Sequence, residues 1–336
     1  MYELPLGLPG VNNLFSIQAY QIRALEDRVK DFANKDNVSI PWIVVTSEST
    51  DAMTKTFMKK LAKDFSFEEG KIKFIKQEDI PCYDMTGQPI HDGDKIMTAP
   101  NGNGGFFEAI QNLLPELRSK GIKYFHVYCV DNILCRIGDP AFIGQCIIDK
   151  ADCAAKVVEK SDPHEKIGII GVESRQKPEL LDVIPDDVVK RYNALEQDLK
   201  LKNKSVCVIE YSEISKEQAE ERDSMNPEKL HFRAGNIAIH FFHIDFLSYV
   251  SHIKLPYHKA EKDIKHKSAD GKNVKTRGIK DERFIFDVFP YSRNFLAYEV
   301  VRDEEFAPLK NNDETGVDCP TTCVEAFKRC QKTYVL

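Results

Sequence analysis

The stretch IPWIVVTS, residues 40–47, indicates the fold class of this chain. It is short and rich in β-branched residues, and apolar and polar positions do not alternate along it. That pattern predicts a strand buried on both faces, as the strands of parallel sheets are. Apolar residues at helical spacing predict helices over 14–34 and 49–65, and a further strand is expected over 71–77. Helix and strand therefore alternate, which is typical of the α/β class with a mainly parallel sheet.

The chain continues in this way through its first half. After a predicted helix over 104–119, apolar runs predict strands over 123–134, 154–160, 166–173 and 204–214. The later strands follow one another closely, which indicates an antiparallel extension of the sheet.

Two charged stretches interrupt the pattern. Residues 174–203 contain an amphipathic helix between two strands that could otherwise form a hairpin, and we interpret them as an inserted surface element. Residues 258–283 are rich in lysine and poor in apolar groups, so most of them are expected to form a solvated loop.

Composition narrows the class of protein. The chain has 336 residues, 42% of them apolar and 30% charged, with a net charge of −6, as in ordinary soluble proteins. A general nucleic-acid binder would need a basic surface, and a membrane span would need about 20 consecutive apolar residues. We therefore expect no nucleic-acid partner, no membrane and a cytoplasmic location. Nine cysteines are expected as free thiols, and CPTTCVEAFKRC (319–330) matches no common zinc spacing.

A glycine-rich turn precedes the predicted helix at 104. The stretch MTAPNGNGG, residues 97–105, has glycine at 102, 104 and 105. Such a turn presents backbone N–H groups at a helix start and lets a ligand approach the main chain, which suits anionic or nucleotide ligands. The alternative is a tight strand-to-helix turn that binds nothing. Because the stretch is neither a Walker A loop nor a GxGxxG loop, its spacing leaves both possibilities open.

Polar residues elsewhere follow or interrupt apolar strands. Asp131 and Asn132 end the predicted strand in VYCVDNIL, where ligands of open parallel sheets bind and where a carboxylate can hold Mg²⁺; the alternative is a turn or helix cap. Asn236, in HFRAGNIAIHFF (231–242), could bond sugar hydroxyls, although a bulge or turn is the stronger interpretation of that stretch alone. Lys280 and Lys310 could contact phosphate or simply water.

Several of these segments, in this order, resemble one known family. The stretches MYELPLGLP, IPWIVVTS, MTAPNGNGG, HVYCVDNIL, ADCAAKVVEK, VIEYSEIS, FRAGNIAIHFF and FIFDVF are similar to segments of the eukaryotic UDP-N-acetylglucosamine pyrophosphorylases, or uridyltransferases. The resemblance implies a Rossmann-like, GT-A-like nucleotidyltransferase with helices on both faces of the sheet. It also implies that UTP and N-acetylglucosamine 1-phosphate react to give UDP-N-acetylglucosamine and pyrophosphate, with Mg²⁺ or Mn²⁺, in a monomer.

The resemblance also implies roles for individual residues. Gln77 and Gly102 would contact uracil, and Asn103 the nucleotide sugar, so that base and ribose lie against the glycine turn. Asp131 would stand near the phosphates and bind the metal. The other implied site residues contact the sugar or the phosphates: Glu210, Tyr211 and Asn236 for the sugar, and Lys280 and Lys310 for the phosphates.

The family has segments before residue 1 and after residue 336 that this sequence does not contain. The resemblance places a Gly-Gly-x-Gly-Thr-Arg loop before residue 1 and a small β-rich domain after residue 336. We therefore expect a catalytic domain over 1–310 without its first strand, the start of a truncated domain over 311–336, and no direct pairing of strands 41–46 and 125–130. The chain is expected to be an incomplete version of a working enzyme. Two alternatives stay open: a non-catalytic UDP-sugar-binding remnant, and a UDP-glucose or UDP-sugar pyrophosphorylase.

Overall fold

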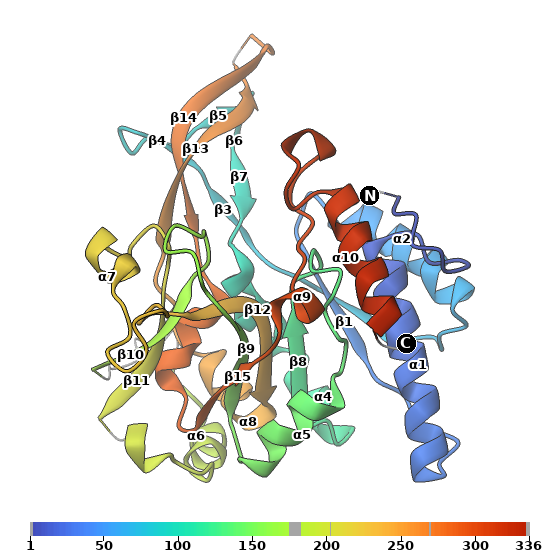
Figure 1. The fold of residues 1–336 in the computed structure, drawn as a ribbon. Coiled ribbons are helices and arrows are strands. Elements are labelled where there is room, and N and C mark those ends of the chain that lie inside the picture. Colours follow the sequence, from blue (N-terminus) through green and yellow to red (C-terminus); the bar gives the residue numbers. More distant parts are fainter. Residues whose placement is uncertain (1–2, 175–182, 202, 269, 334–336) are drawn as a thin grey trace.

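The computed structural model describes residues 3–174, 183–201, 203–268 and 270–333. It is a mixed α/β fold (Figure 1). The α-helices are α1 (Leu14–Ala33), α2 (Asp51–Asp64), α3 (Phe106–Gln111), α4 (Leu114–Ser119), α5 (Pro140–Ile148), α6 (Asp186–Asn193), α7 (Lys216–Glu220), α8 (Ile244–Val250), α9 (Arg302–Glu305) and α10 (Pro320–Thr333). The 3-10 helices are η1 (Asn103–Gly105), η2 (Leu199–Leu201), η3 (Ile285–Tyr291) and η4 (Asp313–Thr315).

The strands lie in five sheets of very different size. They are β1 (Trp42–Thr46), β2 (Ile72–Lys76), β3 (Asp79–Pro81), β4 (Tyr83–Asp84), β5 (His91–Asp92), β6 (Lys95–Ile96), β7 (Thr98–Pro100), β8 (Tyr124–Tyr128), β9 (Cys153–Glu159), β10 (Ile169–Ser174), β11 (Lys204–Ile209), β12 (Ala234–His243), β13 (His258–Lys267), β14 (Asn273–Glu282) and β15 (Phe295–Glu299).

The first helices and strands form as the sequence predicts. Asn13 caps α1 by accepting a hydrogen bond from the Ser16 N–H, and strands β1 and β2 pair in parallel. Trp42 and Val44 of β1 are buried with side chains of α1 and α2, whereas Val45 is 40% exposed. The prediction of a strand buried on both faces is therefore only partly correct.

The largest sheet is mixed, and the expectation of a mainly parallel sheet was wrong for it. Its order is β11-β10-β12-β9-β15, and β8 pairs with β12. Among the described residues of this sheet, β9–β15 is the one parallel pair. The reason is that β12 lies antiparallel between β8 and β9, two strands that run in the same direction. The alternation of helices and strands suggested that β8 and β9 would be parallel neighbours. Instead, each of them pairs with β12, a strand from later in the chain.

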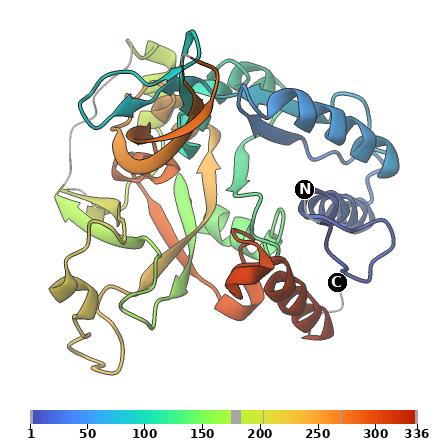
Figure 2. The ribbon, with the colours of Figure 1, turned by 90° about the horizontal axis from the view of Figure 1, so that it is seen from above.

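The strands β1 and β8 belong to different sheets. In the described ranges β1 pairs with β2 and β8 pairs with β12, and no register joins β1 to β8. Direct pairing, which would have contradicted the expectation of a strand between them, is therefore not found. The division into residues 1–310 and 311–336 stays a prediction. Within it, Phe327 of α10 is buried in one cluster with Leu4 and Ile17 at the start of the chain. Figure 2 shows the helices near the two ends of the chain, in blue and dark red, close together.

The solvated loop expected over 258–283 is instead a long hairpin. Strands β13 and β14 pair antiparallel over ten residues each and project from the body of the molecule (Figure 1). Ile264 is buried among Cys82 and Ile90, while most lysines of the hairpin are exposed. A two-stranded ribbon needs few apolar residues, so the high charge of this segment did not indicate strands. Asp270 and Gly271 lie in the turn at its tip, where Gly271 has φ +79°.

Two other predicted elements differ in detail. The helix predicted over 104–119 is divided into α3 and α4, with Pro115 in the first turn of α4. Of the predicted insertion 174–203, residues 175–182 and 202 lie outside the described residues. Its helix α6 packs against α8, where the Tyr192 ring stacks on Tyr249 with 3.8 Å between centroids.

Candidate functional site

The glycine turn is shaped by another part of the chain. Gly102 has φ +72°, and a Cβ built on it would lie 2.4 Å from the Arg283 carbonyl oxygen. A Cβ on Gly104 would lie 2.8 Å from the Arg283 carbonyl carbon, and the Gly104 N–H donates to the Arg283 carbonyl at 2.8 Å. The requirement for glycine at these positions therefore comes from the close approach of the Arg283 main chain, directly after β14. That a base and ribose also lie against this turn stays a prediction.

Asn103 and Gln77 lie at the same turn. The Asn103 side-chain oxygen accepts a hydrogen bond from the Ile285 N–H at 2.8 Å, which fixes the start of η3 on the turn. A Cβ on Gly105 would lie 2.9 Å from the Gln77 Oε1. That oxygen is buried and has no hydrogen-bond partner among the described residues. The Gln77 side chain therefore places a hydrogen-bond acceptor at the turn to which no described residue donates.

Asp131 follows β8 and faces the segment that contains Lys310. Burial raises the pKa of the Asp131 carboxyl, and the nearby Lys310 ammonium offsets part of that rise. The Leu309 N–H donates to the Asp131 carbonyl oxygen at 2.9 Å. The structure therefore brings two residues of the predicted site together from distant parts of the sequence.

Glu210 lies in the same electrostatic surroundings, at the end of β11. Burial raises its pKa most, Glu213 adds to the rise, and His258 and Lys310 lower it. Tyr211, the next residue, is 48% exposed. The charge of Lys310 thus lowers the pKa of a predicted phosphate residue, Asp131, and of a predicted sugar residue, Glu210. That these residues share one site stays a prediction.

Sequence reasoning missed His258 and Asp287 at this site. The His258 Nε2 lies 3.0 Å from the Asp287 Oδ1, and this hydrogen bond is the main cause that raises the pKa of His258. The Asp287 Oδ2 also accepts from the Phe284 N–H at 2.9 Å. The pair joins the base of the hairpin to η3 beside Glu210. No spacing in the sequence indicates this pair, because His258 comes from a segment predicted as a loop and Asp287 lies 29 residues further along the chain.

Asn236 and Lys280 have structural contacts of their own. The Asn236 Oδ1 accepts from the Ala238 N–H at 3.2 Å at a bulge in β12, and Ala238 has φ +56°. The bulge that the sequence favoured at this position is confirmed. Lys280 lies on β14, with its Nζ 3.3 Å from the Glu282 Oε1. Among the described residues, no hydrogen bond or ion pair joins Lys280 or Gln77 directly to Asp131, so a cleft shared by all predicted residues stays a prediction.

The donor set limits the kind of metal site. In the part of the chain that the structure describes, no group of three or more His, Cys, Asp or Glu side chains is arranged to hold a metal ion. Mg²⁺ is commonly held by one or two carboxylates together with phosphate oxygens and water. Asp131 alone therefore fits Mg²⁺ only if a bound nucleotide supplies further ligands.

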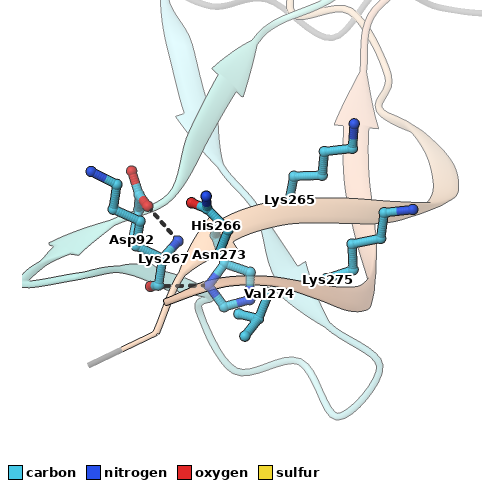
Figure 3. Close-up of a pocket in the computed structure, with 7 residues that line it drawn as sticks. All are labelled: Asp92, Lys265, His266, Lys267, Asn273, Val274 and Lys275. Atoms are coloured by element: carbon cyan, nitrogen blue, oxygen red, sulfur yellow. Dashed lines mark hydrogen bonds between the residues drawn. The ribbon is translucent and has the colours of Figure 1, made fainter. Parts of the chain in front are cut away.

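One cavity lies away from these residues, on the projecting hairpin. It has a volume of about 560 Å³ and contains none of the predicted site residues (Figure 3). Lys265 and Lys275, which are paired across the hairpin, line it, and the Asp92 carboxylate accepts from the Lys267 N–H at 2.7 Å. We do not assign the predicted site to this cavity.

Comparison with known proteins identifies the family. Residues 12–198 match the family model described as UTP–glucose-1-phosphate uridylyltransferase, which is more than half of the chain. The chain belongs to this uridylyltransferase family. The chain is 39% identical, over 97% of its length, to UDP-N-acetylhexosamine pyrophosphorylase-like protein 1 of Xenopus tropicalis. It is 37% identical, over 96% of its length, to the UDP-N-acetylglucosamine pyrophosphorylase of Saccharomyces cerevisiae. The resemblance seen in the sequence is thereby confirmed.

Solved structures agree with this membership of the uridylyltransferase family. The UDP-N-acetylglucosamine pyrophosphorylase of Trypanosoma brucei is 27% identical, with a TM-score of 0.77 over 97% of this chain and 60% of that one. A UDP-glucose pyrophosphorylase of Leishmania major has a TM-score of 0.61 at 18% identity, over 88% of this chain and 57% of that one, which shows a likeness of fold alone.

The chain is shorter than these members of the family. It spans 59% of the Xenopus relative and 63% of the yeast relative. No helix in its described ranges combines the length and the apolar character that crossing a membrane requires.

Proposed function

We propose that this chain forms the uridylyl-transfer site of a UDP-N-acetylglucosamine pyrophosphorylase. The observation that carries the proposal is that relatives named UDP-N-acetylglucosamine pyrophosphorylase, or probable UDP-N-acetylglucosamine pyrophosphorylase, align with nearly the whole chain at 33–39% identity. In the proposed reaction, a phosphate oxygen of N-acetylglucosamine 1-phosphate attacks the α-phosphorus of UTP, and pyrophosphate leaves. Positioning and charge neutralisation carry most such transfers, so no covalent enzyme intermediate is needed.

The proposed roles follow the family resemblance. Gln77 accepts from the uracil N3–H, and the absence of a donor to its buried Oε1 among the described residues supports this role. Lys310, and Lys280 from the hairpin, neutralise phosphate charge. Gly102 and Asn103 contact the nucleotide through the main chain and the Asn103 amide. The sugar contacts are assigned to Glu210, Tyr211 and Asn236.

The metal ion, the type of domain and the location of the protein are part of the same proposal. Asp131 would supply a carboxylate to Mg²⁺ or Mn²⁺, which would neutralise part of the charge on the phosphates. We further infer a Rossmann-like, GT-A-like nucleotidyltransferase domain over 1–310, in a monomeric cytoplasmic protein. A UDP-glucose or broader UDP-sugar pyrophosphorylase is the second candidate, because the matching family model carries the name of the glucose 1-phosphate enzyme.

The proposal predicts how the chain binds sugar nucleotides. In titration calorimetry, UDP-N-acetylglucosamine should bind, and Glu210→Gln should weaken it roughly tenfold, because one hydrogen bond to a sugar hydroxyl contributes about 1.4 kcal/mol. Binding of UMP should stay unchanged in this variant. The matched control is Glu221→Gln on the exposed surface, which should change neither affinity.

Turnover separates the remaining possibilities. Pyrophosphate release from UTP should be measured with the 1-phosphates of N-acetylglucosamine, N-acetylgalactosamine and glucose. The proposal expects the N-acetyl sugars to be preferred. Preference for glucose 1-phosphate would favour the second candidate. Binding without turnover would favour a non-catalytic UDP-sugar-binding protein only if no upstream coding sequence for the Gly-Gly-x-Gly-Thr-Arg loop exists. No binding of any uridine nucleotide would refute all three.

A further inference from the structure

The segment that contains Lys310 is tied to the loop that contains Asp131 by its main chain. The Leu309 N–H donates to the Asp131 carbonyl oxygen at 2.9 Å, and the Ile133 N–H donates to the Ala307 carbonyl oxygen at 3.2 Å. These two bonds flank an antiparallel bridge between residues 132 and 308. The two segments therefore run side by side although about 170 residues separate them in the sequence.

The Asn132 side chain completes this attachment. It is 4% exposed, and its Nδ2 donates to the Glu305 carbonyl oxygen at 2.7 Å. Its Oδ1 accepts from the Ala307 N–H at 3.0 Å and from the Leu134 N–H at 3.2 Å. One buried amide thus satisfies three backbone groups on both segments. Its removal would leave these buried groups without a hydrogen-bond partner, which would loosen the attachment.

A buried ion-pair cluster holds the same segment from the other side. The Lys156 Nζ, whose side chain is fully buried, lies 2.6 Å from the Glu305 Oε2 and 2.6 Å from the Asp139 Oδ2. Arg136 approaches the second oxygen of Glu305 at 3.6 Å. Because a buried charge that loses its partner is strongly destabilising, this cluster fixes α9 against β9 and the start of α5.

The chain beyond α9 is fixed as well. The Lys310 N–H donates to the Asp318 carbonyl oxygen at 2.8 Å. The Lys310 main chain is therefore held on one side by the Asn132 attachment and on the other by residue 318. What stays free to reach a ligand is the Lys310 side chain, close to Asp131.

We propose that Asn132 is a positioning residue: it clamps residues 305–307 onto the Asp131 loop and so places the Lys310 ammonium where it meets the phosphates of a bound uridine nucleotide. The buried pair Lys156–Glu305 supports the same placement. The inference rests on the proposed function, since it assigns Lys310 to the phosphates. Asn132 itself does not touch the substrate.

The test compares UDP with uridine, which lacks phosphates, as ligands of the full chain in titration calorimetry. Asn132→Ala and Lys310→Met should each weaken UDP binding roughly tenfold, as expected for the loss of one charge-assisted phosphate contact, and leave uridine affinity unchanged. In the Lys310→Met background, Asn132→Ala should have no further effect on UDP. The near-isosteric Asn132→Asp, which loses the donor to Glu305, should give the same selective loss.

A matched control is Asn294→Ala. The Asn294 Nδ2 donates to the Asp149 and Lys150 carbonyl oxygens at 2.6 and 3.1 Å, so this asparagine also joins distant segments, but not the two discussed above. Its loss should leave both affinities unchanged. Equal weakening of uridine and UDP by the Asn132 variants, an unchanged UDP affinity, or additive losses with Lys310→Met would overturn the inference. Failure of the unaltered chain to bind either ligand would overturn the proposed function and the inference with it.

Discussion

Gly102 combines two demands that only glycine meets. Its φ of +72° is a conformation that residues with a Cβ rarely adopt, and the Arg283 backbone occupies the place where a Cβ would stand. The sequence drew attention to this glycine by the composition of its turn. It could not reveal the cause, because Arg283 lies about 180 residues further along the chain.

Replacing Gly102 should therefore lower the stability of the fold by more than the strain of its positive φ alone would. Gly102→Ala is expected to lower the free energy of unfolding by about 1–3 kcal/mol more than Gly121→Ala, because of the additional steric overlap. Gly121 is the matched control, since it has φ +78° and nothing within 4 Å of its Cβ position. Urea unfolding of the two variants measures the difference. Equal losses would show that the contact with Arg283 is unimportant.

Asp152 is a buried carboxylate that the sequence did not indicate. It accepts hydrogen bonds from the Ser292 hydroxyl and from the Arg293 and Asn294 N–H groups, the last two at 2.7 and 3.3 Å. Burial nevertheless raises the pKa of Asp152 to about 6. In the unfolded chain the pKa of an aspartate is about 3.9. The folded protein therefore binds a proton at Asp152 at a higher pH than the unfolded chain does.

This difference predicts a pH dependence of stability. The stabilisation that comes from protonating Asp152 is complete below about pH 4 and is lost as the pH rises through about 6. The difference between the folded and unfolded pKa values corresponds to a free energy of about 3 kcal/mol. The stability of the unaltered chain minus that of Asp152→Asn, which cannot ionise, should fall by about this amount between pH 4 and pH 7. Urea unfolding at several pH values measures it, and a difference that stays constant or grows would contradict the assignment.

At the scale of the elements, the sequence predicted best where apolar residues are dense. Helices α1 and α2 and strands β1 and β2 follow from spacing and β-branching, because their own apolar residues face one cluster. The hairpin β13–β14 was missed because its stability comes from cross-strand pairing and from a few buried residues, which a count of charges does not reveal. The pairing of β12 between β8 and β9 could not be predicted for a similar reason, since nothing local specifies the neighbours of a strand.

The hairpin should depend on one apolar contact in the half that lies nearer its tip. Ile264 is buried with Cys82 and Ile90, and its Cδ1 lies 2.9 Å from the Cβ position of Gly278 on the facing strand. Ile264→Ala should speed hydrogen exchange in β13 and β14 and leave the large sheet protected, because this small cluster lies apart from the main core.

The control for the hairpin is Lys265→Ala, an exposed neighbour of Ile264. It should leave exchange unchanged. Faster exchange throughout the chain in Ile264→Ala would show that the hairpin unfolds only with the whole protein.

At the scale of the whole molecule, the candidate site joins segments from the middle and the end of the chain. The Lys310 charge offsets part of the rise in the pKa of both Asp131 and Glu210. That these three residues form one site, as the family resemblance implied, stays a prediction. The contacts that hold them, Asn132 with Glu305 and His258 with Asp287, were not predictable from spacing, because each joins segments far apart in sequence. Figures 1 and 2 show the same principle in the helices, where α1 and α10 from opposite ends of the chain lie close together.

The central claim is that the glycine turn, the Asp131 loop and the residues after β11 form one site for a uridine diphosphate sugar. Hydrogen exchange with and without UDP-N-acetylglucosamine tests it most directly, with peptides that cover residues 101–105, 129–134 and 207–213. The account predicts that the ligand slows exchange in all three segments over the same range of concentration. Slowing in the glycine turn without the Asp131 loop, or slowing confined to the hairpin at 258–282, would contradict it.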